Sequence, residues 1–146
     1  MKIIPVDAAN LSAAAEVHAA SWRESHKDIC SPSFVAAHTA QRQKDYLQKE
    51  LERGKQLFLL VDEGPVGVVS VWENLIENLY VHPAKQGRGY GTALLAFVQS
   101  QCQTPRLWVL NTNERARRFY ENRGFCATGR EHILSDLLRE LEMEQS

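Results

Sequence analysis

A strand, a glycine-rich turn and a helix follow one another in the middle of the chain, and this unit limits the possible folds more than any other feature. Residues 75–81 are mostly apolar and predict a strand. His82-Pro83 ends it, because proline disfavours helix in the preceding residue and removes a backbone donor. Three glycines follow within residues 86–91, and apolar residues then keep helical spacing to about residue 103. The next strand, residues 106–110, should lie parallel to the first, because a strand–helix–strand connection returns the chain in the same direction.

The other segments extend this unit into an α/β fold with a mixed sheet. Further strands are predicted at residues 3–6, 56–62, 66–72, 125–132 and 137–143, and helices at residues 11–22, 31–54, 89–103 and 114–123. Short turns join the strands between residues 56 and 81, so we expect an antiparallel meander there. A second strand–helix–strand unit at residues 106–132 predicts a second locally parallel pairing. The sequence therefore predicts about seven strands flanked by four helices.

Composition narrows the class of protein. Apolar residues make up 44% of the 146 residues and charged residues 24%, which is typical of one globular domain, expected here to span residues 1–146. The longest strongly apolar run, residues 57–61, is too short to cross a bilayer, and the first residues lack the apolar core of a secretion signal. We therefore expect a cytoplasmic protein with no membrane contact. Acidic and basic side chains nearly balance, which argues against binding nucleic acid.

The cysteines and histidines do not indicate a metal site. The three cysteines lie far apart and form no C-x-x-C pair, so neither a disulfide framework nor a thiolate site is expected. The histidines form no H-E-x-x-H pattern, and we expect no metal. Reduced and mostly buried thiols are expected, including Cys126, which begins a strand predicted to be buried. No residue therefore stands out as a covalent nucleophile.

Positive charge is concentrated in one part of the chain. Residues 85–123 hold two acidic groups, Glu114 and Glu121, and seven basic ones: Lys85, Arg88, Arg106, Arg115, Arg117, Arg118 and Arg123. This excess is consistent either with a solvated helix face or with attraction for a polyanionic ligand, and the charges alone leave both interpretations open.

The glycine turn favours a phosphate ligand. Gln86-Gly87-Arg88-Gly89-Tyr90-Gly91 lies where a helix begins, with free N–H groups and the positive end of the helix dipole. Glycine allows left-handed backbone there and lets an anion approach the amides closely. A Walker A loop would need Gly-Lys-Ser/Thr, and a dinucleotide fingerprint would need a later third glycine, so neither motif matches. A turn that serves only tight packing remains an alternative.

Two stretches carry a resemblance to a known family. "LYVHPAKQGRGYGTALL", residues 79–95, resembles the acetyl-CoA signature Q/R-x-x-G-x-G/A of the GCN5-related N-acetyltransferases (GNAT), matched by Gln86, Gly89 and Gly91. "NERARRFYENRGF", residues 113–125, resembles the second signature of this family through Asn113, Ala116, Tyr120 and Gly124-Phe125. The clear match covers about residues 75–125, and the predicted order of elements is similar to that fold from end to end.

The resemblance implies where acetyl-CoA, the expected cosubstrate, would bind. The pyrophosphate would lie on the amides of residues 86–91, and the strand ending at Val81 would splay from the strand at residues 106–110. Pantetheine would lie in that gap like an added strand. The basic face near Arg115 and Arg118 is a further guess for phosphate contacts. The cofactor-binding residues expected on this basis are Leu79, Val81, Gln86, Gly87, Arg88, Gly89, Tyr90, Gly91, Thr92, Asn113 and Tyr120.

The resemblance gives Tyr120 the role of the acid that meets the departing thiolate. A phenol of reference pKa about 10 stays protonated at neutral pH, whereas the reference pKa of a thiol is about 8.5. Packing beside Phe119 with a satisfied hydroxyl is the alternative for Tyr120. On an α-helix, Asn113 and Tyr120 would face one side, two turns apart.

An amine acceptor must lose a proton before attack, so we looked for a base. Glu77, in the strand next to the cofactor, is the first candidate base and a candidate substrate contact; Glu73 and a relayed water are the alternatives. Glu77, Leu79 and Val81 share one face of a regular strand, which leaves Glu77 pointing either to the cleft or to solvent. Trp22 is a weaker candidate for the wall of the substrate site.

The expected function is therefore transfer of acetyl from acetyl-CoA to a primary amine, by direct attack in a ternary complex. A non-catalytic acyl-CoA-binding or sensing domain of the same fold is the alternative. The acceptor would be a small-molecule or peptide amine, and polyamines, amino sugars, lysine side chains and peptide N-termini remain open. A homodimer is possible, since members of the resembling family often pair through their sheets.

Overall fold

The computed structural model describes residues 1–145. The strands are β1 (Lys2–Pro5), β2 (Gln56–Val61), β3 (Pro65–Trp72), β4 (Leu75–Val81), β5 (Arg106–Leu110), β6 (Phe125–Ile133) and β7 (Arg139–Gln145). The helices are α1 (Leu11–His26), α2 (Pro32–Ala36), α3 (Ala40–Glu52), α4 (Tyr90–Gln99) and α5 (Glu114–Glu121), with a short 3₁₀ turn η1 (Pro83–Lys85). The strands form one sheet in the order β1-β2-β3-β4-β5-β7-β6. The predicted mixed α/β fold with seven strands is confirmed.

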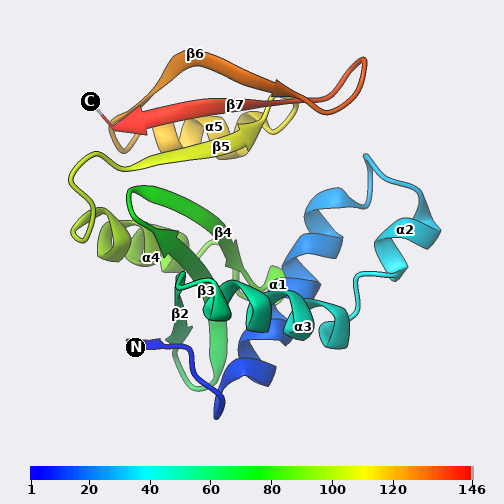
Figure 1. Cartoon of the computed structure of the whole chain (residues 1–146), viewed down its shortest axis with the longest axis vertical. Coiled ribbons are helices and arrows are strands. Elements are labelled where there is room, and N and C mark those ends of the chain that lie inside the picture. Colours follow the sequence, from blue (N-terminus) through cyan, green and yellow to red (C-terminus); the bar gives the residue numbers. More distant parts are fainter. Residues whose placement is uncertain (146) are drawn as a thin grey trace.

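Strands β4 and β5 are the parallel pair of this sheet, and they separate almost at once. Their register contains a single pair, Leu75 with Arg106, at the start of both strands. Figure 1 shows β4 and β5 diverging between the half of the sheet that holds β2 and β3 and the half that holds β6 and β7. The splay expected from the resemblance is therefore confirmed, and it leaves the later part of β4 without a strand partner on that edge.

The second strand–helix–strand unit does not give the predicted parallel pairing. Strand β7 pairs antiparallel with β5 along its whole length, from Arg106 with Glu144 to Leu110 with Glu140. Strand β6 pairs with the other edge of β7. β6 thus runs in the direction of β5 without touching it, because the hairpin partner β7 lies between them.

Residues 1–145 form five α-helices rather than the four predicted, because the helix expected at residues 31–54 is broken. α2 begins after the N-cap Ser31 and ends at Ala36, and Thr39 then caps α3 by accepting a hydrogen bond from the Arg42 amide at 3.2 Å. Thr39 has extended backbone, with φ −76° and ψ 165°, which interrupts the helix. A threonine at an N-cap is a recognisable start signal, and the sequence interpretation overlooked it.

Hydrophobic cores lie on both faces of the sheet at β2 and β3. α1 and α3 pack on one face through Leu11, Val17 and Leu47, whereas α4 packs on the other face through Leu94, Leu95 and Val98. Gly67 of β3 allows the close approach of α4, because a Cβ atom there would lie 2.7 Å from Leu94 Cδ1 and 3.2 Å from the Tyr80 carbonyl oxygen. Helices α1 and α4 both contact β4, from opposite faces of the sheet.

Candidate active site

The glycine turn presents unoccupied backbone donors at the start of α4. Gly87 and Gly89 have left-handed φ values of 80° and 84°, and Gly89 is the N-cap of the helix. Within the described residues no side chain caps α4, and its first turn holds no acidic residue. Gly91 lies in the helix, where a Cβ atom would make only an ordinary 3.6 Å contact with Phe119. Two of the three glycines are therefore needed for backbone geometry, and the turn they make suits an anion.

The side chains of this turn are used in different ways. Gln86 Nε2 donates to the Val81 carbonyl at 3.3 Å, and Tyr90 donates its hydroxyl to Asp62 Oδ2 at 2.5 Å. Arg88 is exposed. Because the Tyr90 hydroxyl donates its proton to Asp62, the backbone amide is the donor that Tyr90 has left for an anion at the turn.

Arg123 is a cation beside this turn that sequence reasoning counted but did not assign. Its Nη2 donates to Thr92 Oγ1 at 2.5 Å, its Nη1 donates to the Phe119 carbonyl at 3.0 Å, and its guanidinium lies 4.0 Å over the Phe119 ring. No ion pair of Arg123 with residues 1–145 is present, and its Nε is buried without a hydrogen-bond partner there. A cation at the positive end of a helix is unfavourable unless an anion joins it. No pattern in the sequence marks this arginine, since only tertiary packing brings it to Thr92.

Val81 exposes backbone to the splayed edge of β4. The His82 amide donates to the Val66 carbonyl at 2.8 Å, so the backbone groups of Val81 face away from β3, because neighbours in a strand alternate. The Val81 carbonyl accepts from Ser21 Oγ at 3.0 Å as well as from Gln86. Its N–H points to the same open edge. Leu79 is partly buried against the core.

Tyr120 combines a packed ring with a hydroxyl that meets no partner among residues 1–145. Its ring lies 5.3 Å from that of Phe119 and 5.8 Å from that of Phe125. Burial raises the pKa of Tyr120 to about 12, so the phenol is protonated over the whole physiological range. The ring thus packs beside Phe119, as in the alternative considered from the sequence, and within residues 1–145 no hydrogen bond is made to its hydroxyl.

Asn113 is the N-cap of α5 rather than part of the helix. Its Oδ1 accepts from the Ala116 amide at 3.1 Å, which leaves Nδ2 as the atom able to meet a ligand. Asn113 is part of the motif at residues 113–125, and it also has a structural role, since asparagine is a favoured N-cap.

Tyr80 is a second tyrosine at the splay, and the sequence analysis gave it no role. Its ring packs edge-on against His18 at 5.0 Å between centroids. Burial raises the pKa of Tyr80, and nearby Tyr120, Tyr46 and Glu140 add to the rise. These neighbours come from α5, α3 and β7, so Tyr80 lies where the two halves of the sheet meet. The alternation of polar and apolar residues in β4 does not indicate this position of Tyr80.

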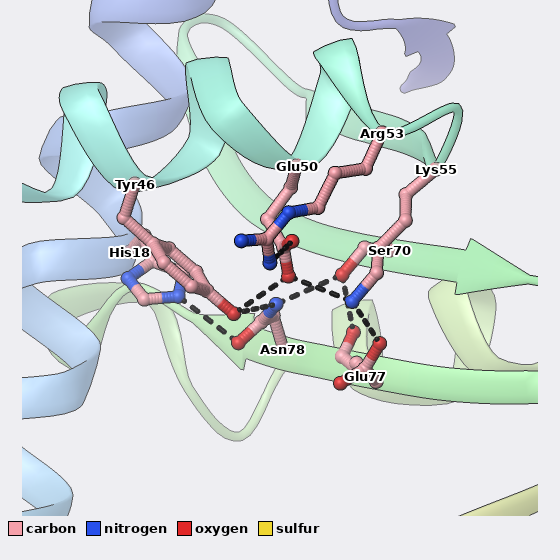
Figure 2. Close-up of polar contacts among 8 residues, drawn as sticks. All are labelled: His18, Tyr46, Glu50, Arg53, Lys55, Ser70, Glu77 and Asn78. Carbon is pink, nitrogen blue, oxygen red and sulfur yellow. Dashed lines mark hydrogen bonds and ion pairs between the residues drawn. The ribbon is translucent and has the colours of Figure 1, made fainter.

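Glu77 does not point freely to solvent, because its carboxylate is ion-paired. Its Oε1 lies 2.9 Å from Lys55 Nζ, which also bonds Glu50 Oε1 at 2.8 Å (Figure 2). Burial acts to lower the pKa of Lys55, but its hydrogen bonds to both carboxylates outweigh burial and raise it.

The second candidate base, Glu73, lies in the turn between β3 and β4. Its φ is 56°, and its carbonyl accepts from Cys102 Sγ at 3.7 Å. β4 begins after it and is still paired with β5 there, so Glu73 lies at the closed end of the splay. This position favours Glu77 over Glu73.

Trp22 lies in an aromatic stack on the helical side of the molecule. Its ring is stacked between His26, at 4.0 Å between centroids, and His38, at 3.5 Å, and Phe34 packs beside it at 5.9 Å. Both faces of the indole are therefore covered, and contact with a substrate through Trp22 stays a prediction.

Three further observations concern the thiols, metal ligands and membrane-spanning helices. Cys126 is exposed rather than buried as predicted, because all residues of β6 after Phe125 are exposed. Within residues 1–145, no cluster of three or more His, Cys, Asp or Glu side chains could hold a metal ion. No helix there is long and apolar enough to cross a membrane.

A family model described as an acetyltransferase (GNAT) domain matches residues 24–145, which include the glycine turn, the splayed strands and Tyr120. The chain belongs to the GNAT acetyltransferase family. Solved structures of the GNAT fold align with nearly the whole chain. The GCN5-related N-acetyltransferase from Rhodopseudomonas palustris has 22% identity and a TM-score of 0.79, over 99% of this chain and 94% of that one.

Two other similar GNAT structures were solved with coenzymes. PaiA N-acetyltransferase from Thermoplasma acidophilum, in complex with coenzyme A, has 20% identity and a TM-score of 0.75, over 100% of this chain and 99% of that one. YncA from Salmonella typhimurium, with its cofactor acetyl-CoA, has 18% identity and a TM-score of 0.69, over 100% of this chain and 93% of that one. No curated protein sequence matches this chain significantly.

Proposed function

We propose that this GNAT protein is an acetyl-CoA-dependent N-acetyltransferase that acetylates a primary amine by direct attack in a ternary complex. The observation that carries the proposal is the protonated hydroxyl of Tyr120, which has no partner within residues 1–145, in a chain whose β4 edge is open and leads to a glycine turn suited to an anion. The PaiA and YncA structures, which contain coenzyme A and acetyl-CoA, support the choice of coenzyme.

The coenzyme lies along β4 in this proposal. Its phosphates accept hydrogen bonds from the amides of residues 86–92, with Arg88 and Arg123 as the nearby cations. Pantetheine runs along the free edge at Leu79 and Val81, like a strand added to the sheet. The free Nδ2 of Asn113 donates to it from the α5 side.

The reaction joins the acceptor nitrogen to the acetyl carbon and breaks the carbon–sulfur bond. The Val81 N–H faces the developing oxyanion, and the Tyr120 hydroxyl faces the departing sulfur. The proton lost by the amine ends on the thiol. A phenol of pKa about 12 is a poor permanent donor to a thiolate of reference pKa about 8.5, since full transfer costs about 5 kcal/mol. Tyr120 therefore acts chiefly as a hydrogen-bond donor that stabilises the thiolate.

Deprotonation of the acceptor is assigned to Glu77 through a water molecule. Oε1 of Glu77 is held by Lys55, which leaves Oε2 to bind the water. Removing this carboxylate lowers turnover without changing the binding of acetyl-CoA.

A non-catalytic acyl-CoA sensor is the second candidate, and the Lys55–Glu77 ion pair is the observation that favours it. A carboxylate neutralised by lysine suits a binding domain that needs no base. The two functions are separated by measuring CoA thiol release from acetyl-CoA across polyamines, amino acids, amino sugars and peptides. Release with one amine class supports the transferase and names the acceptor. Tight acetyl-CoA binding with a flat panel supports the sensor.

A further inference from the structure

The alternation of side chains shows which face of the sheet carries the candidate base. Ile76 of β4 and Leu107 of β5 both belong to the core that packs on α4. Glu77 and Trp108 follow them in their strands, so these two side chains point to the opposite face. Glu77 is accordingly ion-paired with Lys55, which follows α3. An acceptor that is deprotonated at Glu77 therefore approaches the splay from the face that bears Trp108.

This face is covered by helices on one half of the sheet. α1 packs over β3 and β4, and α3 packs on α1, whereas β5, β7 and β6 form the other half of the sheet (Figure 1). Glu140 of β7 is the register partner of Leu110 in β5 and of His132 in β6. The His132 side chain is 58% exposed and that of Glu140 35%. The half of the face that adjoins the splay is therefore open to a ligand at these residues.

Glu140 is a carboxylate without a lysine or arginine partner in residues 1–145. Its neighbour on the same face of β7, Glu142, lies 3.5 Å from Arg106 Nη1 and 2.6 Å from Arg130 Nη2. The partner of Glu140 is instead His132, whose Nδ1 lies 3.8 Å from Oε1. A histidine does not supply the permanent positive charge of a lysine or arginine. Glu140 therefore presents negative charge to a ligand, whereas Glu142 does not.

Aromatic rings surround the Glu140 carboxylate. The Trp108 indole stacks on the His132 ring at 3.8 Å between centroids, with 17° between the planes. Across the splay lies Tyr80, whose hydroxyl makes no hydrogen bond within residues 1–145. Burial raises the pKa of Tyr80 most, and the charge of Glu140 adds to the rise, so the carboxylate is within electrostatic reach of this phenol. A carboxylate next to aromatic rings is a combination that binds an alkylammonium group.

We propose that Glu140 and Trp108 form a subsite for a second cationic group on the acceptor, so that the protein prefers diamines and polyamines to amines that carry no other charge or a carboxylate. The proposal rests on the proposed function, because it assumes that acetyl transfer takes place next to Glu77 on the same face. Glu140 takes no part in the transfer itself in this proposal. It is a specificity-determining residue that holds the far end of the acceptor.

The test uses three series of amines that are matched in length. Diaminoalkanes, monoaminoalkanes and ω-aminocarboxylates of three to eight carbons are compared by CoA thiol release from acetyl-CoA. A range of lengths is used because the second group must reach Glu140 while the first nitrogen meets the thioester. For the wild type we expect the highest kcat/KM with a diaminoalkane, after correction for its two equivalent nitrogens, and the lowest with the ω-aminocarboxylates. Glycyl-lysine amide and glycyl-alanine amide form a further pair, which shows whether a peptide can supply the second cation.

Three variants separate recognition from chemistry. Glu140→Gln should raise KM for the preferred diaminoalkane by about fivefold, with kcat, the Kd of acetyl-CoA and KM for the monoamine unchanged. Trp108→Leu should raise the same KM by about threefold, because it removes the aromatic face. Glu140→Lys should reverse the preference, so that the ω-aminocarboxylate becomes a better acceptor than the diaminoalkane. A merely structural role of Glu140 would not produce this reversal.

Glu131→Lys is the matched control for Glu140→Lys. Glu131 lies in the same hairpin and is 38% exposed, but its register partner Leu141 packs against the core, so Glu131 belongs to the other face of the sheet. The change in net charge is the same in both variants. Glu131→Lys should keep the preference of the wild type for the diaminoalkane.

Equal use of monoamines and diamines by the wild type at every length, or the wild-type preference in Glu140→Lys, would overturn the proposal. If no amine is acetylated, amide chemical shifts of the acetyl-CoA complex during titration with diaminobutane and butylamine decide the matter. Shifts at Trp108 and Glu140 that need both the diamine and an intact Glu140 would support the subsite, and their absence would overturn it. The missing turnover would then count against the proposed function alone.

Discussion

Lys55 Nζ lies 2.9 Å from Glu77 Oε1 and 2.8 Å from Glu50 Oε1, so one lysine joins the candidate base on β4 to a buried carboxylate on α3. The Glu50 side chain is also bonded by the Tyr46 hydroxyl at 3.0 Å. Glu50 burial acts to raise its pKa, but its hydrogen bonds to Lys55 and Tyr46 outweigh burial and lower it. Glu77, the candidate base, is therefore held in place by Lys55 and, through it, by Glu50 of α3. Its effect on catalysis can be tested separately from coenzyme binding.

Glu77→Gln should lower kcat by about 10²-fold, because general-base assistance is worth about that much, and leave the Kd of acetyl-CoA unchanged. Lys55 keeps its bond to Glu50 in this variant, so folding should be preserved. Steady-state kinetics with the best acceptor amine make the measurement, with titration of acetyl-CoA as the control. Unchanged kcat would remove Glu77 from the mechanism and leave water alone as the proton acceptor.

Tyr120→Phe should lower kcat by about 10²-fold, the usual loss for one donor to a developing anion, while acetyl-CoA affinity stays within about twofold. Stability should hardly change, since the hydroxyl has no partner within residues 1–145. Because the pKa of Tyr120 is raised to about 12, the wild-type rate should show no loss from Tyr120 ionisation up to about pH 10. Equal turnover of the two proteins would exclude a role for Tyr120.

Arg123→Met should raise the Kd of CoA by about tenfold or more, because a hydrogen bond to a charged group contributes about 1.5–3 kcal/mol. The dependence of Kd on salt should weaken as well, since one cation at the phosphates is lost. Arg42→Met, which removes an exposed arginine from α3, is the matched control. If Arg123 only joins the end of α5 to α4 through Thr92, the variant will be less stable to unfolding, while the Kd of CoA and its salt dependence will stay the same.

Burial of His18 should make the protein less stable in mild acid. Burial lowers the pKa of His18, and although Asn78 opposes this, His38 and His26 add to it. Below pH 6.5, the ordinary pKa of histidine, His18 binds a proton in the unfolded chain but stays neutral in the folded protein. The contribution of neutral His18 to stability is therefore fully present above that pH and is lost progressively as the pH falls below it. Each proton that only the unfolded chain binds lowers the free energy of unfolding by about 1.4 kcal/mol per pH unit.

His18→Gln tests this assignment, because the glutamine amide can still donate to Asn78 Oδ1. Urea unfolding at pH 7.5, 6.5 and 5.5 should show a shallower loss of stability in the variant. His26, whose pKa burial also lowers, contributes to the remaining slope. Parallel curves for wild type and variant would contradict the assignment to His18.

The sequence indicates those candidate site residues that depend on local backbone chemistry. Gly87 and Gly89 were found because left-handed turns favour glycine, and Asn113 and Tyr120 because they lie in a short motif. The bulge in β4, where Asn78 and Leu79 oppose the single Val69 of β3, was not predicted. An extra residue of this kind does not show in the alternation of polar and apolar residues in a short strand. Arg123 and Lys55 were not assigned, because their partners lie 31 and 22 residues away along the chain and meet them only after folding.

The two fold errors have similar causes. The break between α2 and α3 depends on one cap, Thr39, inside a segment of otherwise helical composition. The missing parallel pairing of β6 depends on β7, which comes later in the chain and inserts next to β5. Local patterns specify elements well, but they do not decide which edge a later strand will use.

Amide chemical-shift mapping of the wild-type protein during titration with acetyl-CoA tests the central claim most directly, and a chain of 16.6 kDa suits it. We predict that the largest shifts occur at residues 79–81 on the open edge of β4, at residues 86–92 in the glycine turn and at residues 113–120 of α5. No shifts at saturating acetyl-CoA, or shifts confined to other parts of the sheet, would contradict the account.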